Sequence, residues 1–169
     1  KKFEKLKKKF LEKQYNEVIE ECILILKNSN VEIFYNLLCL AYNNKGETYK
    51  AIDIMNDALK KNPKNADFLN NLGMFYSNIY DYKKAEEKYK KGLEIEKNNL
   101  SLLNNFANLK KDMDQTDEAI NIYERILSIK SDSLLVMYNL AGLYNSLGEF
   151  EKSKKLYFQM LVHLQQQMF

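Results

Sequence analysis

Side-chain amides recur at one fixed spacing through the middle of this 169-residue chain and are its most regular polar feature. Two files of asparagine repeat at a constant interval of about 34 residues: Asn36, Asn70 and Asn104 in one file, and Asn71, Asn105 and Asn139 in the other. Each amide offers two N–H donors and a carbonyl acceptor, the groups that pair with a peptide backbone. These files are therefore one candidate for pairing with the backbone of another chain. A purely compositional origin is the alternative, because asparagine is also frequent in the loops.

Residues that commonly carry catalysis are sparse. His163 is the only histidine, and the spacing brings no serine or cysteine nucleophile close to it. The sequence contains no glycine-rich phosphate loop and no His-Glu-x-x-His zinc motif. Cys22 and Cys39 lie on apolar faces of separate predicted helices, where a buried thiol is the usual role, so no disulfide or zinc site is assigned. We therefore predict that the protein is not an enzyme and holds no cofactor or metal.

The composition is typical of a soluble helical protein. Hydrophobic residues make up 46% of the chain and charged residues 29%, which excludes disorder. No apolar run approaches the roughly 18 residues of a membrane-spanning helix, and the N-terminus lacks the apolar segment of a signal peptide. Five glycines and one proline are too few for the many turns of a sandwich or barrel. These features predict an all-α, cytoplasmic protein, and the abrupt start of the pattern predicts a longer parent chain.

The net charge of +3 is unevenly distributed. Residues 1–13 contain seven lysines against Glu4 and Glu12, so this stretch carries +5. Apolar residues recur at helical spacing within it: Phe3, Leu6, Phe10 and Leu11. The lysines are therefore assigned to the solvated face of an amphipathic helix, and binding to nucleic acid or a membrane surface is a distant alternative.

The asparagine files belong to a repeat that covers the whole chain. Steps of the same interval align large residues (Leu38, Leu72, Phe106, Leu140), small residues (Cys39, Gly73, Ala107, Ala141, and Ala51, Ala85, Ala119, Ser153), tyrosines (Tyr89, Tyr123, Tyr157) and leucines (Leu59, Leu93, Leu127, Leu161). Small residues let two antiparallel helices pack closely, because they receive the large residues of the other helix. We predict five helical hairpins at about 1–31, 32–65, 66–99, 100–133 and 134–167.

The same spacing locates the turns inside the hairpins. Gly46 and Gly148 occupy equivalent points, where glycine can adopt the left-handed conformation that ends a helix. Tyr80 and Asp114 stand at that point in the middle repeats, so those turns are expected to differ or to carry strain. Pro63 is expected in a loop between hairpins.

These columns resemble the tetratricopeptide repeat family. The matching residues are Leu72-Gly73, Tyr76, Tyr82, Ala85, Tyr89 and Leu93 in one unit, and Leu140-Ala141, Tyr144, Phe150, Tyr157 and Leu161 in the last. Lys110 departs from the pattern, since it replaces an aromatic residue that Tyr42, Tyr76 and Tyr144 supply elsewhere. The resemblance implies a right-handed α-solenoid in which the first helices of the hairpins line a concave face that binds peptides.

The candidate groove consists of amides and a few apolar residues on the predicted first helices: Ile33, Asn36, Leu37, Leu40, Asp67, Asn70, Asn71, Met74, Ser101, Asn104, Asn105, Asn108, Leu135, Tyr138 and Asn139. Asn71, Asn105 and Asn139 are expected to face the groove and to make no contact with the core. A clamp for terminal carboxylates would need lysine or arginine beside asparagine, and only Lys111 is near. We therefore expect a protein or peptide partner that is extended and of low charge.

The predicted function is that of a protein–protein interaction scaffold or adaptor, and the alternative is a structural spacer or self-association module. The last predicted helix is more apolar than one packed face requires: Phe158, Met160, Leu161, Val162, Leu164, Met168 and Phe169 crowd its sequence. Exposed apolar patches mark association sites. We therefore predict that a further helix covers this face, or that the chain forms a homodimer through its C-terminal hairpin.

Overall fold

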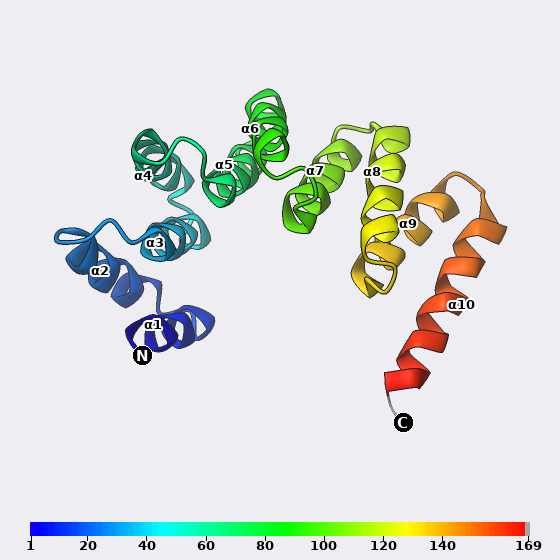
Figure 1. Cartoon of the computed structure of the whole chain (residues 1–169), viewed down its shortest axis with the longest axis horizontal. Helices are drawn as coiled ribbons and strands as arrows, with labels where there is room; N and C mark the ends of the chain where they lie inside the picture. The colour runs from blue at the N-terminus through cyan, green and yellow to red at the C-terminus, as the bar shows by residue number, and fades with distance from the viewer. Residues whose placement is uncertain (168–169) are drawn as a thin grey trace. The chain divides into compact units, whose positions relative to one another are not determined.

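Ten α-helices and no strand make up residues 1–167, the part of the chain that this computed structural model describes (Figure 1). In chain order they are α1 (Lys2–Leu11), α2 (Tyr15–Leu26), α3 (Glu32–Asn44), α4 (Thr48–Lys61), α5 (Ala66–Asn78), α6 (Tyr82–Ile95), α7 (Leu100–Asp112), α8 (Thr116–Ile129), α9 (Leu134–Ser146) and α10 (Phe150–Gln167). The predicted fold class, an all-α array of helix-turn-helix repeats, is confirmed. The residue boundaries of the individual repeat units stay a prediction.

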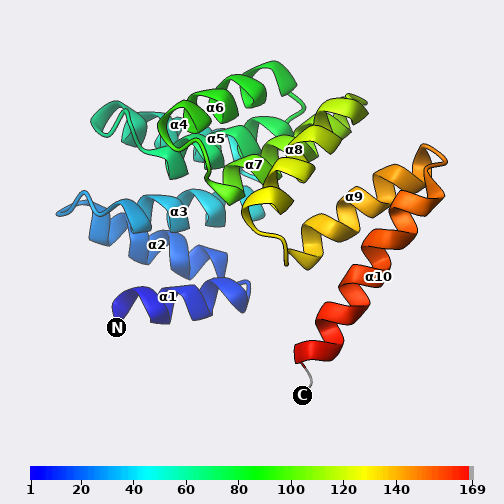
Figure 2. The same ribbon diagram turned by 45° about the vertical axis from the view of Figure 1, so that its right-hand side comes forward.

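The helices pair as consecutive hairpins, which Figure 2 shows from a second direction. Residues 1–97 form one compact unit with α1–α6, here called unit 1, and unit 2 begins at Asn98 and contains α7–α10. Within each unit the second helix of a hairpin packs on the first helix of the next, as α4 does on α5 and α8 does on α9. None of the helices in the described chain is both long and apolar enough to cross a membrane.

Each hairpin turn contains one residue in the left-handed conformation. These residues are Lys13 (φ 62°), Gly46 (87°), Tyr80 (62°), Asp114 (58°) and Gly148 (77°). In every turn the next backbone N–H donates to the carbonyl five residues earlier, for example Glu47 N–H to Tyr42 O at 2.9 Å. This bond satisfies a carbonyl at the helix end. The prediction for Gly46 and Gly148 is confirmed, and Tyr80 and Asp114 adopt the same turn at the cost of backbone strain.

A direct contact in unit 1 explains why the column that contains Gly73 consists of small residues. A Cβ atom added to Gly73 of α5 would lie 2.5 Å from Cε1 of Tyr89 on α6. Tyr89 is buried, so its ring has little room to move away. The second column is also buried: Ala51, Ala85, Ala119 and Ser153. Small residues therefore set how closely the two helices of a hairpin approach.

Both cysteines lie in the core of unit 1. Cys22 packs with Leu6 and Val18, and Cys39 packs with Phe68 and Leu72. Both thiols are free, and burial raises the pKa of each to about 12. The prediction of buried thiols is therefore confirmed. At neutral pH they hold their protons, which makes them poor nucleophiles.

The lysine-rich start of the chain forms the amphipathic helix α1. Leu6 is buried, whereas Leu11 at the end of the helix is exposed and does not join the core as its spacing suggested. Lys9 pairs with Glu17 and Glu21 of α2, with both N–O distances at 2.7 Å. This lysine therefore joins α1 to α2.

In three hairpins a lysine of the second helix lies over the ring of a tyrosine on the first helix. The Nζ atoms of Lys50, Lys84 and Lys152 lie 5.6, 5.4 and 5.2 Å from the ring centres of Tyr42, Tyr76 and Tyr144. Such cation–π contacts contribute about 0.5–1 kcal/mol at exposed sites. The same pairing therefore recurs in three hairpins, at residues eight positions apart.

Candidate functional site

The two asparagine files pair with one another in unit 1. Nδ2 of Asn71 on α5 donates to Oδ1 of Asn36 on α3 at 2.8 Å. Two helical turns further along the same two helices, Nδ2 of Asn78 donates to Oδ1 of Asn43 at 3.0 Å. Both pairs join residues that are 35 positions apart in the sequence. A member of one file therefore bonds the next member of the other, and these amides connect the first helices of neighbouring hairpins.

These pairs leave part of the hydrogen-bonding capacity of the amides unused. Asn71 donates one N–H to Asn36, and its amide carries a second N–H and a carbonyl. Both residues are half-buried, so solvent and a ligand can reach them. The pairing restricts the positions of these remaining groups.

In unit 2 the amides converge on one buried phenol instead. The hydroxyl of Tyr123 on α8 donates to Oδ1 of Asn108 on α7 at 2.5 Å, and the side chain of Asn139 on α9 also hydrogen-bonds to this tyrosine. Burial raises the pKa of Tyr123 to about 12, and the bond from Asn139 acts in the opposite direction. Tyr123 thus ties together three helices. Contrary to expectation, Asn139 contacts the core.

Asn104 has a different environment from its counterpart two repeats earlier, Asn36. Among residues 1–167, Oδ1 of Asn104 is the one buried side-chain polar atom without a hydrogen-bond partner. The counterpart of Asn71 in this repeat is Asn139, and its amide is used by Tyr123. Burial of an unsatisfied carbonyl costs about 1–3 kcal/mol.

The apolar candidates divide into exposed and buried residues. Ile33, Leu135 and Tyr138 are exposed, and Leu40 and Met74 are half-buried. Leu37 was expected in the groove, but it is 6% exposed and packs with Leu6 and Val18 in the core of unit 1. The error arises because α1 and α2 both pack against α3 and contribute Leu6 and Val18 to the cluster that holds this side chain.

The remaining candidates are polar. Asp67 and Ser101 are exposed, and Asn70 and Asn105 are half-buried and take part in interactions of their own. Lys111 is exposed near the end of α7. The candidate residues on α3, α5, α7 and α9 are therefore mostly amides and apolar groups, and Asp67 is the charged member.

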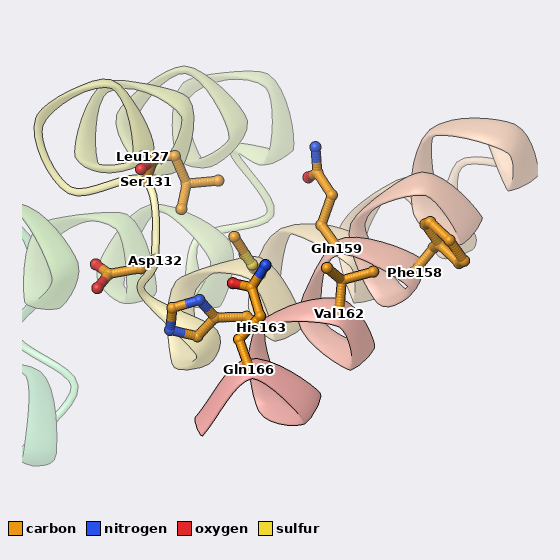
Figure 3. A pocket seen from close by; sticks show the side chains of 9 residues that line it. Leu127, Ser131, Asp132, Phe158, Gln159, Val162, His163 and Gln166 are labelled. Atoms are coloured by element: carbon orange, nitrogen blue, oxygen red, sulfur yellow. The ribbon is translucent and has the colours of Figure 1, made fainter. Parts of the chain in front are cut away.

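His163 lies away from this face, on α10. It is half-buried and lines a cleft of about 570 Å³ whose other walls include Leu127, Asp132, Met137 and Val162 (Figure 3). Figure 3 shows Asp132 and His163 at one end of the cleft and Phe158 at the other. Within residues 1–167 no three histidine, cysteine or acidic side chains gather as a metal site would require.

Comparison with known proteins gives the class of this fold. Residues 54–87 and residues 100–133 each match a tetratricopeptide repeat model. The chain therefore contains tetratricopeptide repeats in these two ranges. No curated protein matches the sequence significantly.

Several solved structures share the fold. MamA superposes with a TM-score of 0.78 at 18% identity, over 95% of each chain. TTC0263, a thermophilic TPR protein of Thermus thermophilus, gives a TM-score of 0.75 at 22% identity, over 82% of this chain and 77% of its own. A tetratricopeptide repeat protein of Parabacteroides merdae gives 0.68 at 23% identity, over 87% of this chain and 52% of its own.

Proposed function

We propose that this protein is a non-catalytic scaffold or adaptor that holds an extended polypeptide of low charge against its first helices. The observation that carries the proposal is the set of half-buried amides on the first helices, one of which, Asn104, has a carbonyl without a donor within the described chain. Backbone N–H groups of an extended segment are suitable donors, since such a segment leaves them unpaired. The half-buried amides of Asn36 and Asn71 supply further bonding groups.

Side chains of the partner would meet apolar groups. Ile33 and Leu40 of α3 lie on the same helix as Asn36, and Leu135 and Tyr138 of α9 provide exposed apolar area in unit 2. With few charges on this face, binding is expected to depend only mildly on salt. We also propose a cytoplasmic location, which the free thiols of Cys22 and Cys39 support, because reducing compartments keep thiols unpaired.

A random peptide library displayed on phage tests the proposal, because the selection does not require the natural partner. Peptides selected on the intact chain should be apolar or neutral, and they should bind Asn104→Leu and Tyr138→Ala more weakly. Each lost hydrogen bond is worth about 0.5–1.5 kcal/mol, which is roughly a threefold to tenfold change in affinity.

Asn121→Ala is the matched control, because Asn121 is an exposed asparagine on the second helix α8. It should leave binding unchanged. Selected peptides that bind all these variants equally would refute the use of this face. Binding that collapses as salt is raised would point to the lysines of residues 1–13 and an acidic partner instead. The alternative, a self-association module, is supported by the exposed face of α10.

A further inference from the structure

Helix α10 exposes a stripe of large apolar side chains. Phe158 is 66% exposed and Leu161 60%, and Tyr157, Val162 and Leu164 are exposed as well. Of the residues predicted to crowd this helix, Phe158, Leu161, Val162 and Leu164 are thus exposed and Met160 is half-buried, and what covers them stays a prediction. Met168 and Phe169 lie outside the described residues. Apolar side chains of this size at helical spacing are typical of a surface that packs against another helix.

The register of the repeat shows what the equivalent positions contact in the preceding hairpin. Phe158 and Leu161 correspond, one repeat earlier, to Glu124 and Leu127 of α8. The hydroxyl of Tyr144 on α9 donates to Oε1 of Glu124 at 2.6 Å, and Leu127 borders a cleft together with Tyr144. These two positions of α8 thus face the next hairpin. On α10 the same positions are apolar and are open to another helix.

A head-to-tail stack of copies would cover α10 with α1 of the next copy, but charge disfavours this arrangement. The exposed residues of α1 include Lys2, Lys5, Lys7 and Lys8, and α10 carries exposed Lys154 and Lys155 in its first half. Like charges brought together at an interface are destabilising. The stripe therefore does not suit the N-terminal helix of a second copy.

The surface beside α10 carries both a protruding aromatic side chain and clefts. Phe158 forms a ridge between two clefts, one of about 570 Å³ with Leu127, Met137 and Val162 in its walls and one of about 420 Å³ beside Leu161. A two-fold axis places the same surface on both copies, so each can offer a ridge and receive one. The bulky ring of Phe158 borders both clefts, and it is therefore the side chain suited to enter the cleft of a partner.

Charge also selects the direction of the pairing. Lys154 and Lys155 precede Phe158, whereas Asp132 lies at the far end of the larger cleft, beside His163 (Figure 3). Antiparallel α10 helices would bring the lysines of each copy toward Asp132 of the other. Parallel helices would bring the lysines of both copies together, which is unfavourable.

We propose that α10 is the interface of a two-fold symmetric homodimer, in which the two α10 helices pack antiparallel and Phe158 of each copy enters the cleft between α8 and α10 of the other. Such an interface closes on itself, so association stops at two copies. The proposal is independent of peptide binding, because it uses the second helix of the last hairpin and not the first helices.

Light scattering on the intact chain over a range of concentrations tests the dimer. Phe158→Glu combined with Leu161→Glu should weaken dimerisation by on the order of 100-fold or more, because both substitutions place charge in a desolvated interface. Tyr49→Glu is the matched control, since Tyr49 is an aromatic residue of α4 that is 70% exposed. It should leave the dimer unchanged, and circular dichroism should show that all variants keep their helices.

Two further variants test the geometry. Lys155→Glu and Asp132→Lys should each weaken the dimer, and the two together should restore it. Leu161→Cys lies close to the proposed two-fold axis and should form a disulfide-linked dimer under air oxidation, whereas Tyr49→Cys should not. A chain that stays monomeric at all concentrations would overturn the proposal. Larger species that grow with concentration would overturn it too, as would a dimer that tolerates the two glutamates.

Discussion

Lys110 holds its Nζ atom 3.0 Å from Oε2 of Glu118, although only 2% of the lysine is exposed. The same ammonium donates to Oε1 of Gln115 at 2.8 Å and lies 5.3 Å from the ring centre of Phe106. A buried charge is tolerated only with such partners. The residue that departs from the repeat pattern therefore has a complete set of contacts.

The residues that contact Lys110 also differ from those at the equivalent positions of the other hairpins. The three other hairpins in this register carry a tyrosine on the first helix, an acid in the turn and a lysine on the second helix: Tyr42, Glu47 and Lys50; Tyr76, Asp81 and Lys84; Tyr144, Glu149 and Lys152. The corresponding positions in the remaining hairpin are Lys110, Gln115 and Glu118. In this hairpin the positive charge therefore lies on the first helix instead of the second, and the acid lies on the second helix instead of in the turn.

This exchange predicts that the effect of one substitution on stability depends on the residues at the other two positions. Glu118→Lys alone should destabilise the protein by about 1–3 kcal/mol, below the roughly 3–5 kcal/mol of a fully buried pair, because Glu118 is partly exposed. The triple variant Lys110→Tyr, Gln115→Glu, Glu118→Lys should recover most of that loss, because it restores the arrangement of the other hairpins. Urea unfolding followed by circular dichroism measures both. A triple variant no more stable than Glu118→Lys would contradict this account, and Lys60→Ala, in an exposed ion pair, should change stability by less than about 0.5 kcal/mol.

The left-handed turn residues predict opposite effects for two substitutions. Gly46→Ala should destabilise the protein by about 1 kcal/mol, although no atom lies within 4 Å of the added Cβ, because alanine is strained at a φ of 87°. Asp114→Gly should leave stability unchanged or raise it by up to about 1 kcal/mol, since it removes the strain at φ 58°. Thermal unfolding of the two variants checks the signs. A stabilised Gly46→Ala would mean that the turn is not left-handed.

Two equivalent asparagines should respond differently to the same substitution. Asn36→Leu removes the acceptor of Asn71 and should cost about 1 kcal/mol. Asn104→Leu removes a buried carbonyl without a partner and should be neutral or stabilising by about 1 kcal/mol. Chemical denaturation of both variants gives the comparison. Equal losses at the two positions would show that Asn104 has a donor after all.

The contact between Gly73 and Tyr89 predicts that a methyl group added at Gly73 destabilises the protein. Gly73→Ala should destabilise unit 1 by about 1–3 kcal/mol, because the buried ring cannot move aside without strain. Gly142→Ala is the control on α9, where no atom lies within 4 Å of the added Cβ, and it should stabilise the helix by about 0.5–1 kcal/mol. The order of the two melting temperatures decides the point: Gly73→Ala must melt below the unsubstituted protein and Gly142→Ala at or above it.

The sequence by itself determined the features that repeat. Helix pairing, the small residues at Gly73 and Ala107, and the glycine turns follow from local sterics that act in the same way in each hairpin, so the repeat period exposes them. The asparagine files were visible for the same reason. The spacing also singled out Tyr80 and Asp114, because they stand where glycine is expected.

Only the tertiary structure decided which polar groups pair. Asn71 bonds Asn36, but the equivalent Asn139 bonds Tyr123 and leaves the carbonyl of Asn104 without a donor. A hydrogen bond forms only when donor and acceptor approach to about 3 Å in the right direction. That distance is set by the packing of helices from different hairpins, and a one-dimensional spacing does not contain it.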